Sequence, residues 1–276
     1  MKVAFWSNAR GKSCVTSNLA CISVLSILGS DSPDKRTIIF ENHQNIINLG
    51  NVLICPNSKN EVCEQNQYYV EQGLSKVLCH MEMGDEPSEE QIFRYSRQYL
   101  GKQLFYLSSQ GTKNGEVLEY QLERECIPTI QCLEKYSNRV FVDTAATTLV
   151  SSRKILQQSD VIVVNLNQNH SMLEHFFGNY SSIQSKAFYV IGNYDGDAIL
   201  TRGMIMQKYH IPGRQIAVIP HCAQFSDALS EGMLIPFLLA NYYCDRDSPN
   251  YSFIQGAKEA VQLFENHLCS VQERGG

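Results

Sequence analysis

The sequence predicts an α/β protein whose doubly wound, mainly parallel sheet of about seven strands is covered by helices on both faces. Seven short β-rich runs recur along the chain, and most are continuously apolar, as expected of strands that are buried on both faces. Longer stretches of helical character separate most of these runs, and this alternation is typical of parallel βαβ units. We therefore expect one domain over residues 1–276.

The elements follow from these patterns in chain order. The expected strands cover residues 2–6, 37–40, 104–107, 140–142, 161–164, 188–191 and 216–219. The clearest expected helices cover residues 13–28, 117–136, 148–158, 170–183 and 198–209. Pro128 falls inside the second helix, and proline both lacks an N–H donor and clashes with the preceding turn. We therefore expect that helix to be kinked or divided into two shorter helices.

Residues 56–100 form the least regular part of the sequence. The segment is polar near residues 57–67 and has helical character over residues 70–83 and 89–99. We interpret it as a partly helical insertion between the second and third strands, packed on an edge of the sheet. Binding of a partner is the alternative role.

The last helical segment has an apolar face, and two interpretations of it differ in function. The face consists of Phe253, Ala257, Ala260, Val261, Phe264 and Leu268. A helix on a membrane surface usually carries several basic residues on its polar side, and only Lys258 is available here. A helix that docks on the protein core is therefore favoured.

Composition excludes several classes of protein. The chain is 43% hydrophobic and 18% charged, with a formal net charge of −5 and a pI of about 5.8, so nothing indicates a globally basic nucleic-acid binder. The N-terminus lacks a secretory signal pattern, and polar residues interrupt the apolar stretch 15–28. We expect a cytoplasmic protein without a strong sign of nucleic-acid or membrane binding.

The ten cysteines do not form a C-x-x-C pair, so a zinc ribbon or a redox dithiol has little support. Scattered metal ligands at Cys79-His80 and His221-Cys222 are one interpretation. Free, largely buried thiols in a reducing cytosol are the favoured one.

The strongest chemical signal is a strand, a loop and a helix at the N-terminus. A phosphate-binding loop needs backbone N–H groups at a helix N-terminus, a lysine that reaches the phosphates and a hydroxyl for magnesium. Gly11, Lys12 and Ser13 supply the last part of such a loop in the right order and directly after a strand. The first glycine of the full motif would fall at Trp6, so an ordinary turn at Gly11 is the alternative. The candidate phosphate-binding residues are Asn8, Ala9, Arg10, Gly11, Lys12, Ser13 and Cys14.

Several segments together make the sequence resemble the ParA/MinD family of P-loop ATPases, which have a deviant Walker A loop. The similar segments are GKSCVTSNLA, VFVDTAATT, DVIVVNLNQN, YVIGNYD and VIPHCAQFSDALSEGMLIPFL, in the family's order. The resemblance implies a P-loop fold that binds ATP and Mg²⁺. It also implies that Ser13 and Asp143 hold the metal and that Asn193 and Pro220 contribute to the nucleotide site.

Two of these residues also have interpretations that do not depend on the family. A carboxylate at the end of a central strand, such as Asp143, lies beside the P-loop in a doubly wound sheet and can hold a metal-bound water. The alternative for Asp143 is an ordinary helix cap. Asn193 can hydrogen-bond adenine, but Asn-Tyr-Asp-Gly is equally an ordinary turn sequence.

The sequence also departs from the family pattern. Ser7 stands where the family has its signature lysine, which reaches across a nucleotide-bound dimer, and Arg10 is the cation nearby. Asn42 aligns with the aspartate that orients the attacking water, and Glu41 precedes it. The residues implied in catalysis are therefore Lys12, Asn42 and Glu41. Without an aspartate at the aligned position, we expect ATP hydrolysis to be slow or absent.

Three functions follow from these observations. The first is a nucleotide-dependent homodimer that recruits an unidentified protein partner and helps to position or partition a cellular cargo. The second is a pseudo-ATPase scaffold on the same fold. The third is a small-molecule kinase, for which Arg94 and Arg97 would have to close over the phosphates, although a solvated helix face explains them equally well.

Overall fold

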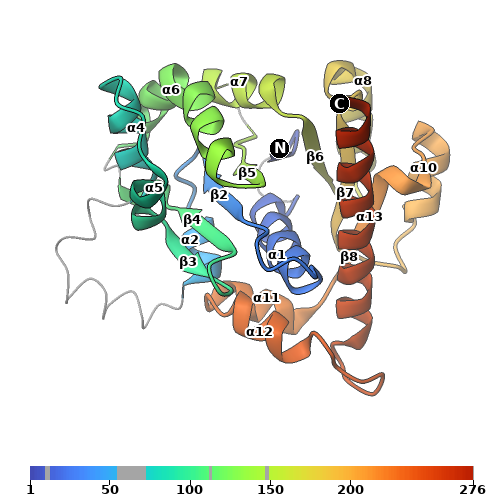
Figure 1. The fold of residues 1–276 in the computed structure, drawn as a ribbon. Helices are drawn as coiled ribbons and strands as arrows, with labels where there is room; N and C mark the ends of the chain where they lie inside the picture. Colours follow the sequence, from blue (N-terminus) through green and yellow to red (C-terminus); the bar gives the residue numbers. More distant parts are fainter. Residues whose placement is uncertain (10–12, 55–72, 112–113, 147–148, 276) are drawn as a thin grey trace.

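The computed structural model describes residues 1–9, 13–54, 73–111, 114–146 and 149–275, and it contains an eight-stranded sheet between helices (Figure 1). The strand order across the sheet is β3-β4-β2-β5-β1-β6-β7-β8. The seven parallel strands are β1 (Lys2–Trp6), β2 (Thr37–Glu41), β4 (Leu104–Leu107), β5 (Arg139–Asp143), β6 (Val161–Leu166), β7 (Ala187–Tyr194) and β8 (Ile216–Pro220). They correspond to the seven runs expected from the sequence, which confirms the doubly wound α/β class.

The eighth strand was not expected. Strand β3 (Arg97–Tyr99) pairs antiparallel with β4 at the edge of the sheet. The turn between them places Leu100, Gly101 and Lys102 in the left-handed region, with φ of 51°, 63° and 68°. The helix expected over residues 89–99 therefore ends at Tyr95, because the chain turns back along β4 to complete its hydrogen bonds.

The α-helices of the described residues are α1 (Val15–Leu28), α2 (Leu49–Leu53), α4 (Leu74–Glu82), α5 (Glu89–Tyr95), α6 (Gly115–Tyr136), α7 (Val150–Gln158), α8 (His170–Asn179), α9 (Ser181–Gln184), α10 (Arg202–Tyr209), α11 (Ala223–Ser230), α12 (Leu234–Asn241) and α13 (Tyr251–Gly275). Helix α6 runs through Pro128 as one element, so the expected division there is wrong. Its buried side, which includes Leu118, Leu122 and Leu133, offsets the cost of the proline. The helix expected over residues 170–183 is two helices that meet at Tyr180.

The helices cover both faces because successive strand residues point to opposite sides of the sheet. Val3 and Phe5 of β1 pack with α1 and α13, whereas Ala4 packs with α4, α6 and α7. The apolar face expected on the last helix is buried in α13: Phe253, Ala257, Ala260, Val261, Phe264 and Leu268 are each at most 8% exposed. This helix therefore docks on the core, as the favoured interpretation predicted.

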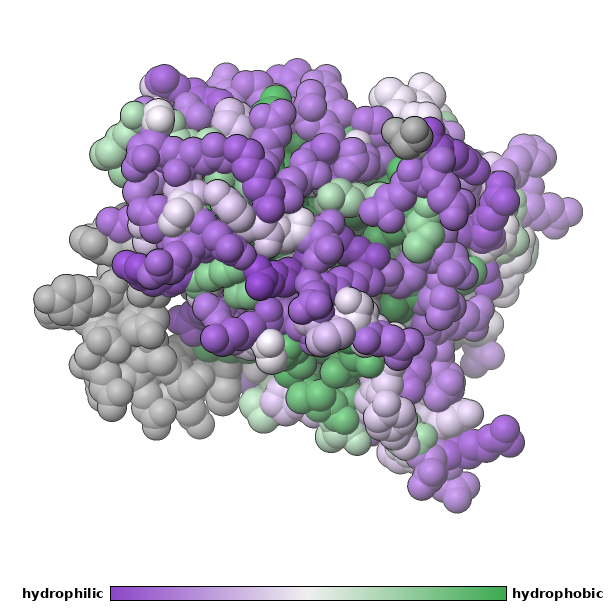
Figure 2. Space-filling view, in the orientation of Figure 1, coloured by the Kyte–Doolittle hydropathy of each residue, from purple (hydrophilic) through white to green (hydrophobic). Residues whose placement is uncertain are grey.

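The surface is mostly hydrophilic in the view of Figure 2, with apolar side chains gathered over α12. Met233 and Leu239 contribute to that patch with exposed fractions of 37% and 50%. None of the helices in the described ranges is long and apolar enough to cross a membrane. The eight cysteines in the same ranges are free thiols, and half of them are buried.

Candidate functional site

The loop after β1 lies at the edge of the sheet where the parallel strands end. Arg10, Gly11 and Lys12 fall outside the described residues, so the structure describes only the two ends of the loop. These ends are joined, because the Ser13 hydroxyl donates to the Ala9 carbonyl over 3.2 Å. Ser13 is 3% exposed, so its hydroxyl lies inside the site and away from bulk solvent.

Asn8 connects the same loop to α8. Its Nδ2 donates to the Met172 carbonyl over 3.0 Å and lies 3.2 Å from Nδ1 of His175. Ser7, which replaces the family's lysine, is only 1% exposed, and its hydroxyl accepts from the Ala9 amide over 3.3 Å. The loop thus begins with polar side chains that are committed to local hydrogen bonds.

Trp6 stands where the full P-loop motif has its first glycine, and it belongs to the core. The residue is 4% exposed, and its ring lies 5.1 Å from Tyr180 and 6.4 Å from Phe176, measured between centroids. Its indole Nε1 is buried without a hydrogen-bond partner among the described residues. Strand β1 therefore continues through this position, and the loop begins after it.

Helix α1 begins later than expected. Cys14 adopts a left-handed conformation with φ 55° and ψ 31°, and the helix starts at Val15 rather than at residue 13. A non-glycine residue in this region interrupts helical geometry, so Ser13 precedes the helix instead of lying in its first turn. This is a correction to the expected helix 13–28.

The start of α1 lies directly against β7. A Cβ atom added at Gly192 would approach Asn18 Nδ2 to 2.5 Å and the Cys14 Cβ to 3.0 Å. Asn18 is buried and donates to Asn165 Oδ1 of β6 over 2.7 Å. The glycine in YVIGNYD therefore allows a close approach between β7 and the first turn of α1.

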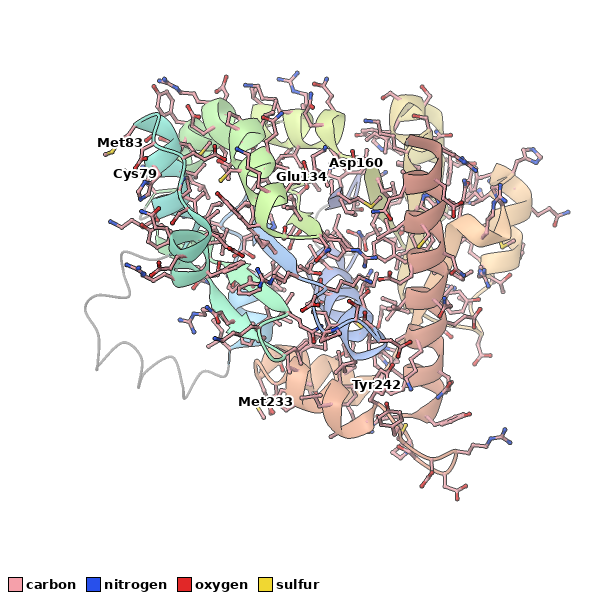
Figure 3. All side chains as sticks on the ribbon, viewed as in Figure 1. Cys79, Met83, Glu134, Asp160, Met233 and Tyr242 are labelled. Carbon is pink, nitrogen blue, oxygen red and sulfur yellow. The ribbon has the colours of Figure 1, made fainter. Side chains whose placement is uncertain are left out.

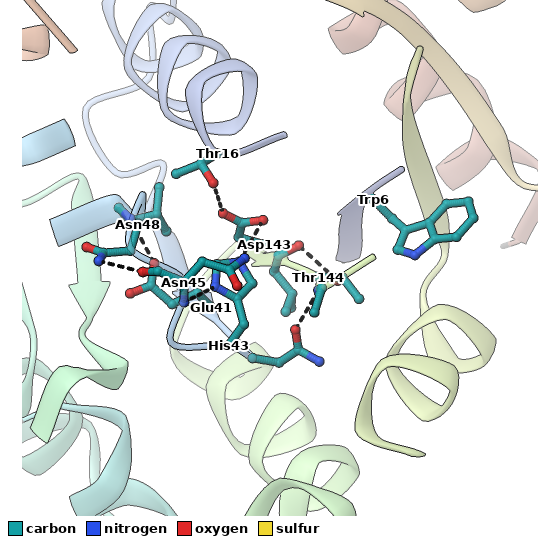
Figure 4. A network of polar contacts seen from close by, with 12 residues as sticks. Trp6, Thr16, Glu41, His43, Asn45, Asn48, Asp143 and Thr144 are labelled. Atoms are coloured by element: carbon teal, nitrogen blue, oxygen red, sulfur yellow. Dashed lines mark hydrogen bonds and ion pairs between the residues drawn. The ribbon is translucent and has the colours of Figure 1, made fainter. Parts of the chain in front are cut away.

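Asp143 links α1 to the loop after β2 (Figure 4). Its Oδ2 accepts from the Thr16 hydroxyl over 2.6 Å, and its Oδ1 lies 3.3 Å from His43 Nε2. Burial disfavours the imidazolium, but the hydrogen bond and charge of Asp143, with the charge of Glu41, raise the pKa of His43 above its usual value. Three segments far apart in sequence thus meet at one carboxylate.

Glu41 lies on the same face of the sheet as Asp143, because the two residues are register partners on β2 and β5. Its Oε1 accepts from the hydroxyls of Tyr106 (2.7 Å) and Ser109 (3.1 Å), and its Oε2 accepts from the Leu49 amide (2.9 Å). The residue is 0% exposed, and this burial raises the pKa of the Glu41 carboxyl.

Asn42 points to the opposite face, as the two-residue period of a strand requires. Its Oδ1 accepts from the Ala145 amide over 2.7 Å, and its Nδ2 donates to the hydroxyls of Ser151 (3.0 Å) and Ser152 (2.9 Å). The side chain therefore holds the loop after β5 against α7. The catalytic roles of Glu41, Asn42 and Lys12 stay predictions, and the first two side chains are occupied by structural hydrogen bonds.

Asn193 and Pro220 come together on the neighbouring strands β7 and β8. Asn193 has a left-handed conformation with φ 50°, and its Oδ1 lies 2.7 Å from His221 Nδ1. Pro220 packs against α13, where a Cβ added at Gly256 would approach the proline ring to 2.5 Å. The structure thus places both residues at the same edge of the sheet as the loop after β1.

Sequence reasoning missed Thr16 and His43. Thr16 occurs within the segment GKSCVTSNLA and His43 follows Asn42 directly. Their contacts, however, depend on where α1 begins and how the loop after β2 turns. The kinase hypothesis needs Arg94 and Arg97 on one helix, and they lie on α5 and β3. Arg94 instead pairs with Glu90 on the surface over 2.8 Å.

The sequence matches no protein-family model and no curated protein. Solved structures match at low identity. A ParA family ATPase from Chlorobium tepidum TLS has a TM-score of 0.67 at 12% identity, with 94% of this chain and 96% of that chain covered. The septum site-determining protein MinD of Pyrococcus horikoshii OT3, complexed with Mg-ADP, has a TM-score of 0.65 at 13% identity, with 96% of each chain covered.

A third similar structure is the MinC:MinD cell division protein complex of Aquifex aeolicus, with a TM-score of 0.65, 14% identity and 96% of each chain covered. This chain has a ParA/MinD-like P-loop fold. The sequence prediction that residues 8–14 bind phosphate concerns the loop that follows β1 in this fold.

Proposed function

We propose that this chain is an ATP-binding switch of the ParA/MinD type, which dimerises with nucleotide and acts in positioning or partitioning a cellular cargo. The contacts of Asp143 are the main observation that supports this proposal. Its carboxylate connects Thr16 at the start of α1 with His43 in the loop after β2. A ligand in the loop before α1 would therefore bias the conformation of a second loop, which is the requirement for a switch.

The nucleotide would occupy the loop at residues 8–14, with Lys12 on the phosphates and the base near Asn193 and Pro220. The ParA/MinD-like fold supports this assignment, and the similar MinD of Pyrococcus horikoshii is a complex with Mg-ADP. Backbone N–H groups at a helix start attract phosphate because they are unpaired and lie at the positive end of the helix dipole.

Ser13 and Asp143 suit a magnesium ion that takes most of its other ligands from phosphate and water. The carboxylate of Asp143 retains lone pairs beyond its bonds to Thr16 and His43, and the Ser13 hydroxyl retains acceptor capacity beyond its donated bond. Across the described ranges, no three His, Cys, Asp or Glu side chains gather to hold a metal alone. Ser13 and Asp143 would hold the ion, which when bound would neutralise phosphate charge.

Weak or absent hydrolysis is part of the proposal. Orientation of an attacking water needs a side chain with a free acceptor at the end of β2. Glu41 is 0% exposed and Asn42 is 2% exposed, and both side chains are hydrogen-bonded to groups of the chain itself. Either side chain would have to move out of this buried position before it could act on a water molecule.

The proposed homodimer would form through this same edge of the sheet, with Arg10 contributing a cation in place of the missing lysine. The loop after β2 presents Ile46 and Ile47 there, with exposed fractions of 91% and 67%. The partner protein is unidentified, although the similar Aquifex MinD is in a complex with MinC. We place the switch in the cytoplasm.

A pseudo-ATPase scaffold is the second candidate. It is favoured by the observation that Glu41, Asn42 and Asp143 are all hydrogen-bonded to groups of the chain itself. The left-handed Cys14 before α1 also departs from a helix that starts within the phosphate loop. Such a protein would keep the fold and its partner surface without turning over ATP.

Equilibrium dialysis with labelled ATP and Mg²⁺ tests the proposal. Wild type and the control Lys208→Ala, an exposed lysine of α10, should bind ATP, and Lys12→Ala should lose it. Sedimentation should show an ATP-dependent dimer that Arg10→Ala weakens. Absence of binding in wild type would refute every nucleotide-dependent function. Binding without measurable phosphate release or dimer would favour the scaffold.

A further inference from the structure

A polar cavity lies at the opposite end of α1 from the phosphate loop. Its volume is about 400 Å³, within the usual range of small-molecule pockets. The walls are the last turns of α1, one side of α13 and Tyr242, which Figure 3 shows beside these two helices. Ten residues of helix separate Thr16 from Ser26, a distance of about 15 Å. The cavity is therefore separate from the candidate site described above.

The charged groups of the cavity leave an excess of positive charge. Lys35, Lys258 and Glu265 all line it. The carboxylate of Glu265 is already held by the Arg139 guanidinium through two bonds of 2.5 Å. Lys35 adds a third contact to this carboxylate over 3.1 Å. Arg139 does not line the cavity, and its charge balances that of Glu265. The two lysines therefore leave the cavity with a net positive charge, although Lys35 also contacts Glu265.

Lys258 is fixed at the cavity wall by aromatic contacts. Its ammonium donates to the Tyr242 carbonyl and lies 3.8 Å from the centroid of the Tyr242 ring. An ammonium group has three N–H donors, so one backbone contact leaves donors available. The position of this cation is therefore set before a ligand arrives, which lowers the entropy lost on binding.

One hydroxyl group in the cavity wall has no hydrogen-bond partner in the described part of the chain. Ser26 Oγ is buried and unpaired, whereas Ser23, on the same helix, donates to the Leu19 carbonyl over 2.7 Å. A buried unpaired hydroxyl destabilises the fold, so a ligand that accepts its hydrogen bond gains affinity. The Tyr242 hydroxyl lies where Gly29 leaves room, 3.2 Å from the position a Cβ would take.

We infer that this cavity binds a small organic anion, a carboxylate or phosphate monoester on a short apolar body. The anionic oxygens would lie between Lys35 and Lys258 and accept from the hydroxyl of Ser26. The apolar body would pack on Leu25 and Val261, which also line the cavity. Cations, hydroxyl donors and apolar walls occur together here, and this combination fits an organic anion better than it fits a neutral or purely inorganic ligand.

Titration calorimetry with benzoate, phenyl phosphate and neutral benzamide tests the inference on the full chain. The two anions should bind with dissociation constants in the millimolar range or tighter, as expected for ligands of about ten heavy atoms. The tighter of the two identifies the anionic group. Benzamide should bind at least tenfold more weakly. Equal binding of benzamide, or no anion binding below about 10 mM, would overturn the inference.

Variants then locate the site. Lys35→Met and Lys258→Met should each weaken anion binding roughly tenfold, because each removes a charged hydrogen-bond donor. The matched control Lys208→Met on α10 should bind as wild type does. Ser26→Ala should weaken binding several-fold without lowering the melting temperature, since its hydroxyl has no partner in the described residues. Unchanged affinity in all three cavity variants would place the anion elsewhere.

Discussion

Replacement of Asn42 by aspartate tests whether this side chain is structural or catalytic. Asparagine donates to Ser151 and Ser152, and a carboxylate cannot donate. Ser152 can turn its own proton toward the new carboxylate. Ser151 cannot, because its hydroxyl already donates to Glu119 over 2.5 Å. The variant therefore keeps the bond from the Ala145 amide. It loses the bond to Ser151, and its new carboxylate oxygen repels the Ser151 hydroxyl oxygen.

The magnitude follows from burial. Asn42 is 2% exposed, and the carboxylates of Glu41 and Asp143 on the adjacent strand ends are at most 1% exposed. A lost hydrogen bond costs about 1 kcal/mol, and a third buried carboxylate adds at least as much again. We expect Asn42→Asp to lower the free energy of unfolding by about 3 kcal/mol, which corresponds to roughly 5 °C in melting temperature for a chain of this length.

Urea denaturation measures this change, and the fluorescence of Trp6, the single tryptophan, reports unfolding because the ring is buried. Ser152→Ala should cost about 1 kcal/mol, since Asn42 keeps its bond to Ser151. The exposed control Asn266→Asp should stay within about 0.5 kcal/mol of wild type. If Asn42→Asp is as stable as wild type and releases phosphate faster, the side chain is catalytic and the structural argument is refuted.

Two further predictions concern packing and charge. Burial disfavours the charged form of Glu265, but the hydrogen bonds and charge of Arg139 hold the pKa of this carboxyl below its usual value. The ion pair therefore stabilises the fold fully at pH values above the unfolded pKa of about 4.3. This stabilisation is lost as the pH falls through the lower pKa of the folded state. Glu265→Gln should thus destabilise the protein by about 3 kcal/mol at pH 7 and by much less near pH 3, measured by denaturant unfolding at both values. Gly192→Ala should cost about 1–3 kcal/mol because its Cβ meets Asn18 at 2.5 Å, whereas Gly196→Ala, where nothing lies within 4 Å, should be neutral in the same assay.

Local pattern was sufficient to predict most of the fold. The seven parallel strands are apolar runs, and a strand buried on both faces needs no other signal than its own composition. Strand β3 lacks this signal, because its residues Arg97, Gln98 and Tyr99 are mainly polar and become a strand only by pairing with β4. Helix α6 continues through Pro128 because tertiary burial of its apolar side outweighs the local propensity.

The site was predictable only at the level of segments. The strand ends that carry Glu41, Asn42 and Asp143 were found from the sequence, since carboxyl ends of parallel strands meet at one edge. Which side chain faces which helix depends on strand register, and a shift of one residue reverses it. The contacts of Thr16 and His43 depend on a helix start and a loop conformation, and these are set by three-dimensional packing.

The end of β2 connects both faces of the sheet, and this explains why we favour a switch over an efficient ATPase. On one face, Glu41 holds the start of α2 through the Leu49 amide. On the other, Asn42 holds Ala145, two residues after Asp143, and the first turn of α7. In the switch that we propose, a change at either loop would be transmitted through the strand end to the other. The same hydrogen bonds hold Glu41 and Asn42 in the positions from which a water molecule would be oriented, so the proposal links this connection between the loops to weak hydrolysis.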